Sequence, residues 1–251
     1  GTSHHLGQNF AKAFDVKFQD RDMQLKYVYA TSWGVSTRLI GGMIMTHSDD
    51  DGLVIPPRLA PLPVVFVPIY RKDDERELVL NRIASITDGW DPLFYKVDDR
   101  DQYRPGYKFA EWEVKGVPLR VEIGPRDVAQ NTVVVVRRDT KEKTTCSCDT
   151  LLDTLKTMLS DMQQDLFNAA RERMNARTYT VDSYDEYRER VEEGGFFRVF
   201  LDVDNPEVEA KLQEDTRSTV RCIPFDRPDE EGPCMITGKP CRGRVIASQS
   251  Y

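Results

Sequence analysis

The chain has 251 residues, of which 39% are hydrophobic and 31% are charged. This composition is typical of a globular protein with one large domain or two to three small ones. No apolar run approaches the ~18 to 20 residues that span a bilayer, so the sequence predicts no membrane segment. The start, 1-GTSHHLGQNF-10, lacks the basic and apolar regions of a signal peptide.

The net charge of −7 argues against a dedicated nucleic-acid binder, which is usually basic, although a local basic patch can still bind phosphate. The cysteines are few and odd in number, which favours free thiols in a reducing compartment and hence a cytoplasmic protein. They are Cys146, Cys148, Cys222, Cys234 and Cys241.

Hydrophobic periodicity predicts an alternation of strands and helices, and therefore an α/β (α+β) fold with a mixed sheet. Strands are expected at 25–34, 64–69, 92–97, 118–123, 132–138, 143–147, 195–201, 218–225 and 243–248. Helices are expected at 36–46, 74–88, 105–116, 150–176, 183–193 and 205–213. Paired glycines in 36–46 predict a helix buried against a sheet, and the four prolines of 56–63 predict a linker.

Arg38 lies among small and apolar residues in 31-TSWGVSTRLIGGMIMTHSDDDG-52. A guanidinium group is always charged and forms bidentate hydrogen bonds with phosphate oxygens, so one interpretation is a phosphate site. A core arginine paired with an acid is the alternative, and spacing does not separate the two. The acidic run Asp49–Asp51 is interpreted as a solvated turn rather than a metal site.

The run 30-ATSWGVSTRLIGGMIMTH-47 resembles the third signature motif of class II aminoacyl-tRNA synthetases. More narrowly, 1-GTSHHLGQNFAKAF-14 and 52-GLVIPPRLAP-61 resemble the prolyl-tRNA synthetases of the archaeal-eukaryotic type. The similarity covers nearly the whole chain: it continues through 104-RPGYKFAEWEVKGVPLRVEIGPRD-127, 137-RRDTKEK-143, 221-RCIPF-225 and the terminal Tyr251.

The resemblance implies three regions. Residues 1–60 would end a class II antiparallel-sheet catalytic core, 61–165 would form an α/β anticodon-binding domain with a mixed sheet, and 166–251 a small α/β domain of the zinc-binding type. In the family the other two class II motifs, and an acid that grips the proline nitrogen, precede the TSH element. The resemblance therefore implies the carboxyl-terminal half of an enzyme, or a half whose upstream part is another chain.

The implied activity is ATP-dependent activation of proline and its transfer to tRNA(Pro), with Mg²⁺ accompanying ATP, in a homodimer. Arg38 would act in catalysis and, together with Ser36, in ATP binding. The proline pocket would be formed by Thr2, His4, Ser32, Trp33 and Gly34.

The implied anticodon contacts are Lys108, Glu111, Trp112, Lys115, Arg120, Glu122 and Arg126. The cations would meet phosphates or bases, the carboxylates would accept from guanine edges, and Trp112 would stack on an unpaired base. For Phe109, packing of its helix on the sheet is the favoured interpretation. Arg137 and Arg138 are as compatible with solvation as with a functional role.

Relatives hold zinc in the last domain through two cysteine pairs. Here Val203 and Val208 stand in place of the first pair, and Thr237 replaces one cysteine of the second, so only Cys234 remains. No zinc is expected. The resemblance also implies that the carboxylate of Tyr251 helps to organise the active site.

Three alternatives remain open at this stage. The chain could be a tRNA anticodon-binding fragment without catalysis, which failure to release pyrophosphate from ATP would favour. It could be another class II synthetase, threonyl or glycyl, although the TSH and TSWG elements argue against the threonyl enzyme. A purely structural assembly protein fits least, because it has no use for the setting of Arg38.

Overall fold

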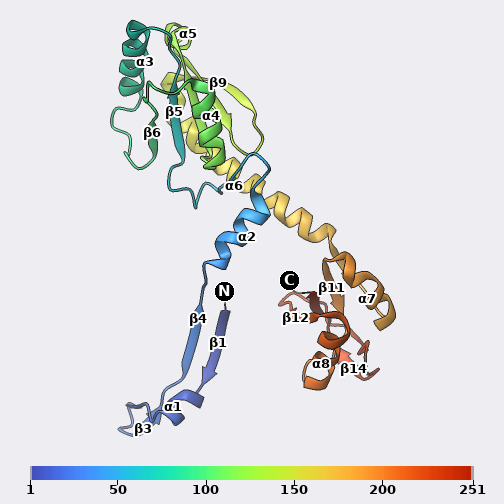
Figure 1. Ribbon diagram of the computed structural model, residues 1–251. Coiled ribbons are helices and arrows are strands. Elements are labelled where there is room, and N and C mark those ends of the chain that lie inside the picture. Colours follow the sequence, from blue (N-terminus) through green and yellow to red (C-terminus); the bar gives the residue numbers. More distant parts are fainter. Residues whose placement is uncertain (1, 250–251) are drawn as a thin grey trace. The chain divides into compact units, whose positions relative to one another are not determined.

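The computed structural model describes residues 2–249. The chain forms two compact units that divide between Leu166 and Phe167, inside the long helix α6 (Leu151–Ala176) (Figure 1). Among the residues described, no helix is both long and apolar enough to cross a membrane.

The chain begins with short elements in the first unit. Strand β1 (Thr2–Gly7) pairs antiparallel with β4 (Ala30–Gly34), and β2 (Lys17–Gln19) pairs antiparallel with β3 (Leu25–Tyr27). Helix α1 (Asn9–Ala13) follows β1. The single strand predicted at 25–34 is therefore two strands, and each pairs with a different partner.

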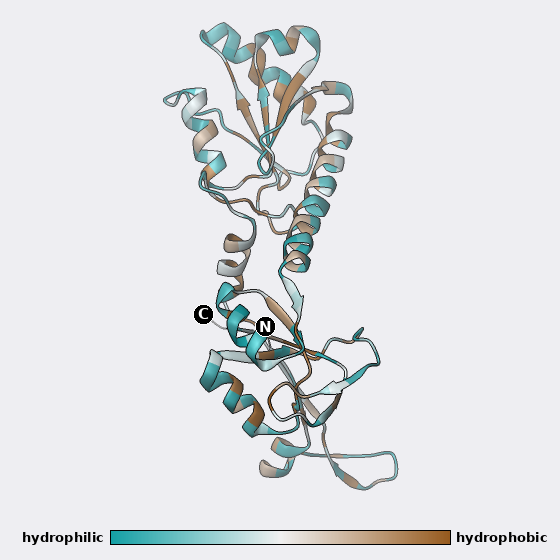
Figure 2. Ribbon diagram, turned by 90° about the vertical axis from the view of Figure 1, so that its right-hand side faces the viewer, coloured by the Kyte–Doolittle hydropathy of each residue, from teal (hydrophilic) through white to brown (hydrophobic). Residues whose placement is uncertain are grey.

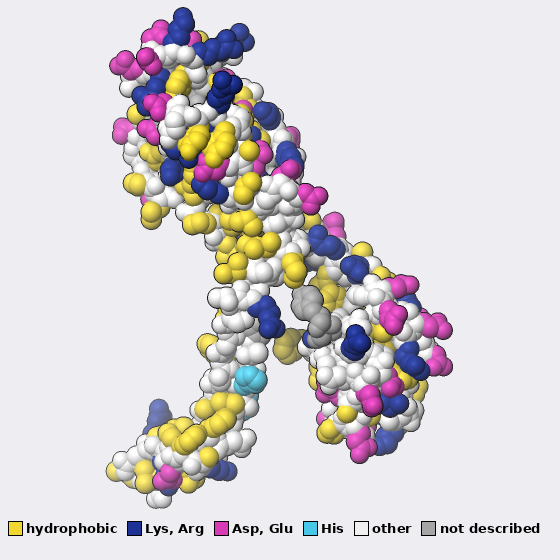
Figure 3. Space-filling view, viewed as in Figure 1, with side chains coloured by type: hydrophobic (Ala, Val, Ile, Leu, Met, Phe, Trp, Pro, Cys, Tyr) yellow, Lys and Arg dark blue, Asp and Glu magenta, His cyan; other side chains and the backbone are white. Residues whose placement is uncertain are grey.

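Helix α2 (Arg38–His47) forms as predicted, but the prediction that it is buried is wrong. None of its residues is buried, and Leu39, Ile40 and Met45 are exposed. Figure 3 shows hydrophobic side chains on the surface of this region. An apolar run becomes a core only where another surface covers it, and none of residues 2–249 buries this helix.

The rest of the first unit is built on a five-stranded sheet in the order β6-β5-β7-β8-β9. The inner strand β5 is parallel to β6 and β7, whereas β8 is antiparallel to its two neighbours β7 and β9, so the predicted mixed sheet is confirmed. The strands are β5 (Val64–Pro68), β6 (Tyr95–Val97), β7 (Leu119–Ile123), β8 (Thr132–Arg137) and β9 (Lys143–Ser147).

Helices cover both faces of this sheet. Alternate residues of β5 point to opposite faces: Val64 and Phe66 pack with α3 (Asp73–Ile86) and α6, and Val65 and Val67 pack with α4 (Pro105–Val114). Burial on both faces explains why β5 is apolar throughout, and Figure 2 shows the hydrophobic strands beneath helices with polar outer faces. The short helix α5 (Pro125–Gln130) was not predicted.

The second unit contains a four-stranded sheet in the order β10-β11-β15-β12 and a separate hairpin of β13 and β14. Its strands are β10 (Thr178–Thr180), β11 (Phe196–Val199), β12 (Ser218–Cys222), β13 (Glu231–Pro233), β14 (Pro240–Arg242) and β15 (Val245–Gln249). Helices α7 (Tyr184–Arg190) and α8 (Pro206–Thr216) pack on this sheet through Tyr187, Val208 and Leu212. β10, β13 and β14 have three residues each, too few to show a periodicity.

Arg137 and Arg138, at the end of β8, are both held in ion pairs and neither is solvated. Arg138 is 3% exposed, donates two hydrogen bonds of 2.8 and 2.6 Å to the carboxylate of Asp49, and a third of 3.0 Å to the carbonyl of Glu113. These hydrogen bonds hold the pKa of Asp49 at about 2, despite the opposing effect of burial. The acidic turn is thus exposed to solvent, as predicted, and is also tied to the sheet domain through Asp49.

Two glycines allow this turn to approach α4. Gly116 ends the helix with φ +70°, and a Cβ there would lie 2.6 Å from the Cβ of Leu53. At Gly52, with φ +134°, a Cβ would lie 2.5 Å from the Cα of Val114. Only glycine fits both the conformation and the space.

Gly116→Ala should lower the free energy of unfolding by about 2 kcal/mol, because it combines a left-handed conformation with a steric overlap. The matched control is Gly106→Ala in α4, where a Cβ would have no neighbour within 4 Å. We expect the control to be neutral or stabilising in urea unfolding. Equal stability of the two variants would contradict the close approach.

Candidate functional site

The β1–β4 pair brings four of the five residues predicted for the proline pocket to one face. Thr2 is paired with Gly34, and His4 with Ser32. Residues directly opposite in an antiparallel pair project to the same face. A Cβ on Gly34 would lie 3.0 Å from Thr2 Oγ1, so the missing side chain leaves space beside this hydroxyl group.

Trp33 does not join this group. It is paired with Ser3, and the alternation along the strand places its ring on the opposite face, where it is 81% exposed. The predicted aromatic wall and the side chains of Thr2 and His4 therefore lie on different faces of the strand pair.

Arg38 is the first residue of α2 and follows directly on the turn that contains Ser36. Its side chain is exposed, and no hydrogen bond or ion pair holds the guanidinium group within residues 2–249. The structure therefore does not place Arg38 in a core beside an acid. It leaves the cation available to an anionic ligand.

In the sheet domain, the buried carboxylate of Asp98 connects several of the predicted anticodon residues. Asp98 follows β6 and is 2% exposed. It accepts hydrogen bonds of 2.7 and 2.8 Å from Arg100 and one of 2.8 Å from Trp112 Nε1. Lys108 Nζ lies 3.9 Å from the carboxylate and donates to the Asp98 carbonyl at 2.9 Å.

Asp98 remains ionised in this setting. Burial alone would raise the pKa of Asp98, but the hydrogen bonds from Arg100 and Trp112 and the charge of Lys108 outweigh it and hold this pKa at about 2. Burial lowers the pKa of Lys108, against the attraction of Asp98. Asp98 was not predicted as a site residue, although its position directly after a predicted strand could have indicated one.

The network continues to the surface through Glu111. Glu111 accepts from Arg100 at 2.7 Å and from Lys115 at 2.5 Å, and Lys115 lies 4.6 Å from the centre of the Trp112 ring. Asp98 and its partners thus link the start of α4 to its end. Lys115 keeps half of its side chain exposed.

Two predicted anticodon contacts need correction. Lys108 is 1% exposed and Trp112 is 7% exposed, and Asp98 engages the polar atoms of both. A ring enclosed in the core cannot stack on a base, because its faces already pack against protein. Both residues therefore stabilise the domain from within its core and are not direct contacts for a base.

A second ion-pair cluster lies on β7. Arg120 donates at 3.1 Å to Glu122 and at 2.8 Å to Glu113, and its guanidinium group stacks 4.3 Å from the centre of the Phe109 ring. Arg120 is 8% exposed and Glu122 7%. Phe109 packs against the α4 core, in accordance with the favoured interpretation. Glu113 was not predicted, and it shares Arg120 with Glu122.

Of the predicted anticodon cations, Lys115 and Arg126 are exposed, whereas Lys108 and Arg120 are buried. Arg126 lies at the start of α5, just beyond the end of β7. Of the predicted carboxylates, Glu111 is partly exposed and fixed by ion pairs, whereas Glu122 is buried. The exposed cations can bind phosphate, and Glu111 can accept a hydrogen bond from a base edge.

The degenerate zinc position lies in the core of the second unit. Cys234 and Val208 are each 2% exposed and belong to one cluster, but Val203 is 38% exposed and does not replace a ligand by packing. Burial raises the pKa of Cys234, yet hydrogen bonds from Thr237 and neighbouring backbone groups lower it overall. The described residues contain no group of three or more potential metal ligands, and Tyr251 lies outside them.

Comparisons with known proteins agree with this geometry. Residues 70–158 match the family model "Anticodon binding domain", and residues 184–251 match "Prolyl-tRNA synthetase, C-terminal". Three similar proteins are named "Proline--tRNA ligase". The chain is 50% identical to that of Bacteroides fragilis over 257 residues, 50% to that of Chloroflexus aurantiacus over 255, and 48% to that of Roseiflexus castenholzii over 255.

Each of these matches covers 100% of the chain but only 52% or 53% of the relative. The chain thus spans about half the length of the curated relatives it matches.

Asp98→Asn should lower the free energy of unfolding at pH 7 by about 2 kcal/mol, because it leaves the buried Lys108 without its counter-charge. The pKa of Asp98 is depressed in the folded state, so its contribution is present above pH ~5 and is lost as the pH falls towards 2.

The wild-type chain should therefore lose more stability than Asp98→Asn between pH 6 and pH 3, measured by urea unfolding at both values. The control is Asp88→Asn, which changes an exposed carboxylate. The same acid dependence in wild type and Asp98→Asn would refute the assignment.

Proposed function

This chain belongs to the prolyl-tRNA synthetase family and matches the carboxyl-terminal half of its members, and we propose that residues 61–165 bind the anticodon of tRNA(Pro). The observation that carries the proposal is the match of residues 70–158 to an anticodon-binding family, on a sheet domain whose exposed cations flank fixed carboxylates. A rigid frame suits base recognition, since positioned donors and acceptors discriminate better than mobile ones.

Within this proposal the predicted residues divide into two roles. Lys115 and Arg126 are exposed and contact the RNA directly. Glu111 is partly exposed and is held by ion pairs in a fixed position from which a base edge can be recognised, whereas Arg120 and Glu122 are buried and stabilise the frame of the domain.

We further propose that residues 1–60 contribute to the activation of proline with ATP and Mg²⁺ in the complete enzyme. Thr2, His4, Ser32 and Gly34 form one side of the proline site, while Ser36 and Arg38 bind ATP phosphate. Two observations support this: the space that Gly34 leaves beside Thr2, and the exposed guanidinium group of Arg38, which has no ion-pair partner within residues 2–249. Such a group stabilises the negative charge that develops during adenylate formation.

Residues 166–251 are proposed to form an accessory domain that folds without zinc. The apolar surface of α2 supports a larger assembly, because exposed apolar patches mark surfaces that become covered. We place the complete enzyme in the cytoplasm as a homodimer.

The proposal predicts that the chain binds a proline tRNA about tenfold more tightly than the same tRNA with altered anticodon bases, roughly 1.4 kcal/mol. Arg126→Ala should reduce this ratio, whereas Lys156→Ala, which changes an exposed cation on α6, should not. Binding is measured by fluorescence anisotropy at one stated salt concentration. Equal affinity for both RNAs would contradict anticodon recognition.

Exchange of pyrophosphate into ATP in the presence of proline separates catalysis from binding alone. A chain that binds tRNA but shows no exchange acts as an anticodon-binding module. Proline-dependent exchange that Arg38→Ala abolishes assigns catalysis to these residues.

Treatment with EDTA should leave the thermal unfolding temperature of the chain unchanged, because Val208 and Cys234 pack in a buried apolar cluster that we propose to be stable without a metal. A structural zinc ion stabilises its domain strongly, so its removal would lower the temperature. Metal analysis of the untreated protein checks the same point, and a stoichiometric zinc content would contradict the prediction.

A further inference from the structure

A polar cavity of about 530 Å³ lies at the carboxyl ends of β5 and β6, and Lys108 of the Asp98 network forms part of its lining. Its walls are the segment after Pro68, the first turn of α3 and the loop from Asp101 to Arg104. In open α/β sheets, ligands bind in the crevice outside the carboxyl ends of the parallel strands. Its volume is within the roughly 300–1,000 Å³ of ligand-binding pockets.

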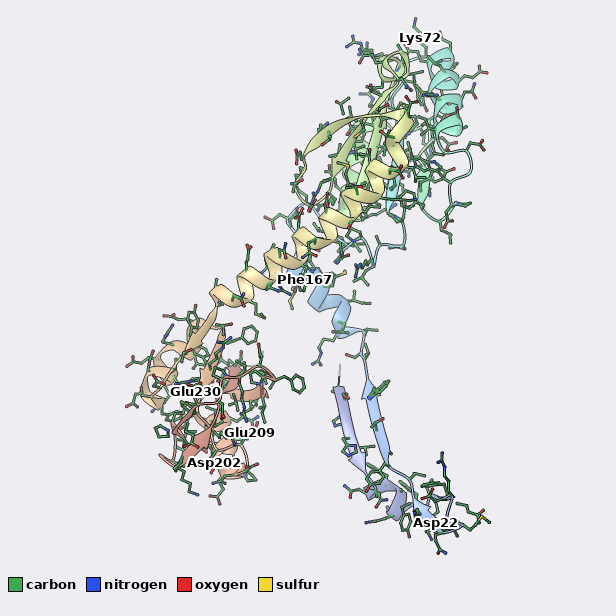
Figure 4. All side chains as sticks on the ribbon, turned by 180° about the vertical axis from the view of Figure 1, so that it is seen from behind. Asp22, Lys72, Phe167, Asp202, Glu209 and Glu230 are labelled. Atoms are coloured by element: carbon green, nitrogen blue, oxygen red, sulfur yellow. The ribbon has the colours of Figure 1, made fainter. Side chains whose placement is uncertain are left out.

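The cavity is basic although the chain carries a net charge of −7. Its lining contains two carboxylates, Asp73 and Asp101, and five cations: Arg71, Lys72, Arg76, Arg104 and Lys108, the last of which is paired with Asp98. Figure 3 shows Lys and Arg side chains at this end of the domain, and Figure 4 labels Lys72 at the start of α3.

Three of these cations are free to bind a ligand. Arg71, Lys72 and Arg104 are exposed, and no ion pair engages them in the part of the chain that the structure describes. Lys72 directly precedes α3 and makes no side-chain capping hydrogen bond. In addition, the buried Nε of Arg76 has no hydrogen-bond partner in residues 2–249, although such a group is normally satisfied.

An aromatic stack lies beside the cavity. Arg100 sits 5.0 Å from the centre of the Tyr103 ring, and Tyr103 stacks on Tyr107 with ring centres 4.6 Å apart and an interplanar angle of 17°. Tyr107 is 54% exposed, so the stack can be extended. Because Asp98 fixes Arg100, the platform is held in place before any ligand arrives.

We propose that this cavity binds the backbone phosphate of a single-stranded nucleotide in the tRNA anticodon loop, while the adjoining base stacks on Tyr107. Cations that track the backbone beside aromatic platforms are the usual means of binding single-stranded RNA. The aromatic stack favours a nucleic acid over an acidic peptide, which has no base to place there. The inference rests on the proposed function, and adds a contact that strengthens binding without reading the anticodon sequence.

The test compares Arg71→Ala/Lys72→Ala with the control Lys156→Ala/Lys239→Ala, which removes the same charge from two exposed lysines outside the cavity. Binding of proline tRNA, with and without the altered anticodon, is measured across a range of salt concentrations. Circular dichroism verifies that each variant is folded.

We expect the cavity variant to weaken binding of both RNAs equally, by about tenfold, and to lower the slope of log K against log salt by roughly 1.4, or about 0.7 for each phosphate contact. Tyr107→Leu should weaken binding by about tenfold through lost stacking, and Tyr107→Phe should restore it. The control variant should match the wild type.

An affinity and salt slope equal to those of the control would overturn the inference while leaving anticodon recognition intact. A wild-type chain that binds tRNA but ignores the anticodon would refute the proposed function instead. Polyglutamate and AMP are tested as competitors. Binding of either that depends on Arg71 and Lys72, without an effect of these residues on tRNA, would assign the cavity to another ligand and overturn the inference.

Discussion

The candidate RNA surface depends on the hydrogen bonds and ion pairs of the buried Asp98 carboxylate. It accepts from Arg100 and Trp112 and lies beside Lys108, so one ionised group fixes the loop after β6 and the inner face of α4. A buried charge is tolerated only when its partners satisfy it, and this requirement makes the arrangement specific. Through Arg100 the same carboxylate orients both Glu111 and the Tyr103 ring.

The ion pairs also explain how an acidic protein can present a surface to RNA. Ion pairs hold carboxylates in or against the sheet domain at fixed positions. Glu122 pairs with Arg120, and Asp49 pairs with Arg138. Cations without such partners, Arg71 and Lys72 among them, lie together at one end of the domain. The local charge therefore matters more for binding than the net charge, because salt screens exposed charges that lie more than about a Debye length apart.

The sequence predicted most regular elements of the sheet domain, because patterns such as the apolar run of β5 are local. It did not predict which aromatic residue is enclosed: Phe109 and Trp112 lie on the same helix, and only the tertiary partner Asp98 shows that Trp112 faces inward. The sequence likewise did not show that Arg138 pairs with Asp49, which lies 89 positions away. The exposure of α2 was missed because an apolar pattern carries no information about which surface covers it.

The central claim is that tRNA binds to the sheet domain at the exposed cations around α3, α4 and α5. The most direct test is chemical footprinting of lysine and arginine side chains in the chain with and without proline tRNA. We predict protection of Lys72, Lys115 and Arg126, with Lys156 and Lys239 equally reactive in both states. Protection confined to Lys239 and other residues of the second unit, with Lys115 and Arg126 unchanged, would contradict the account.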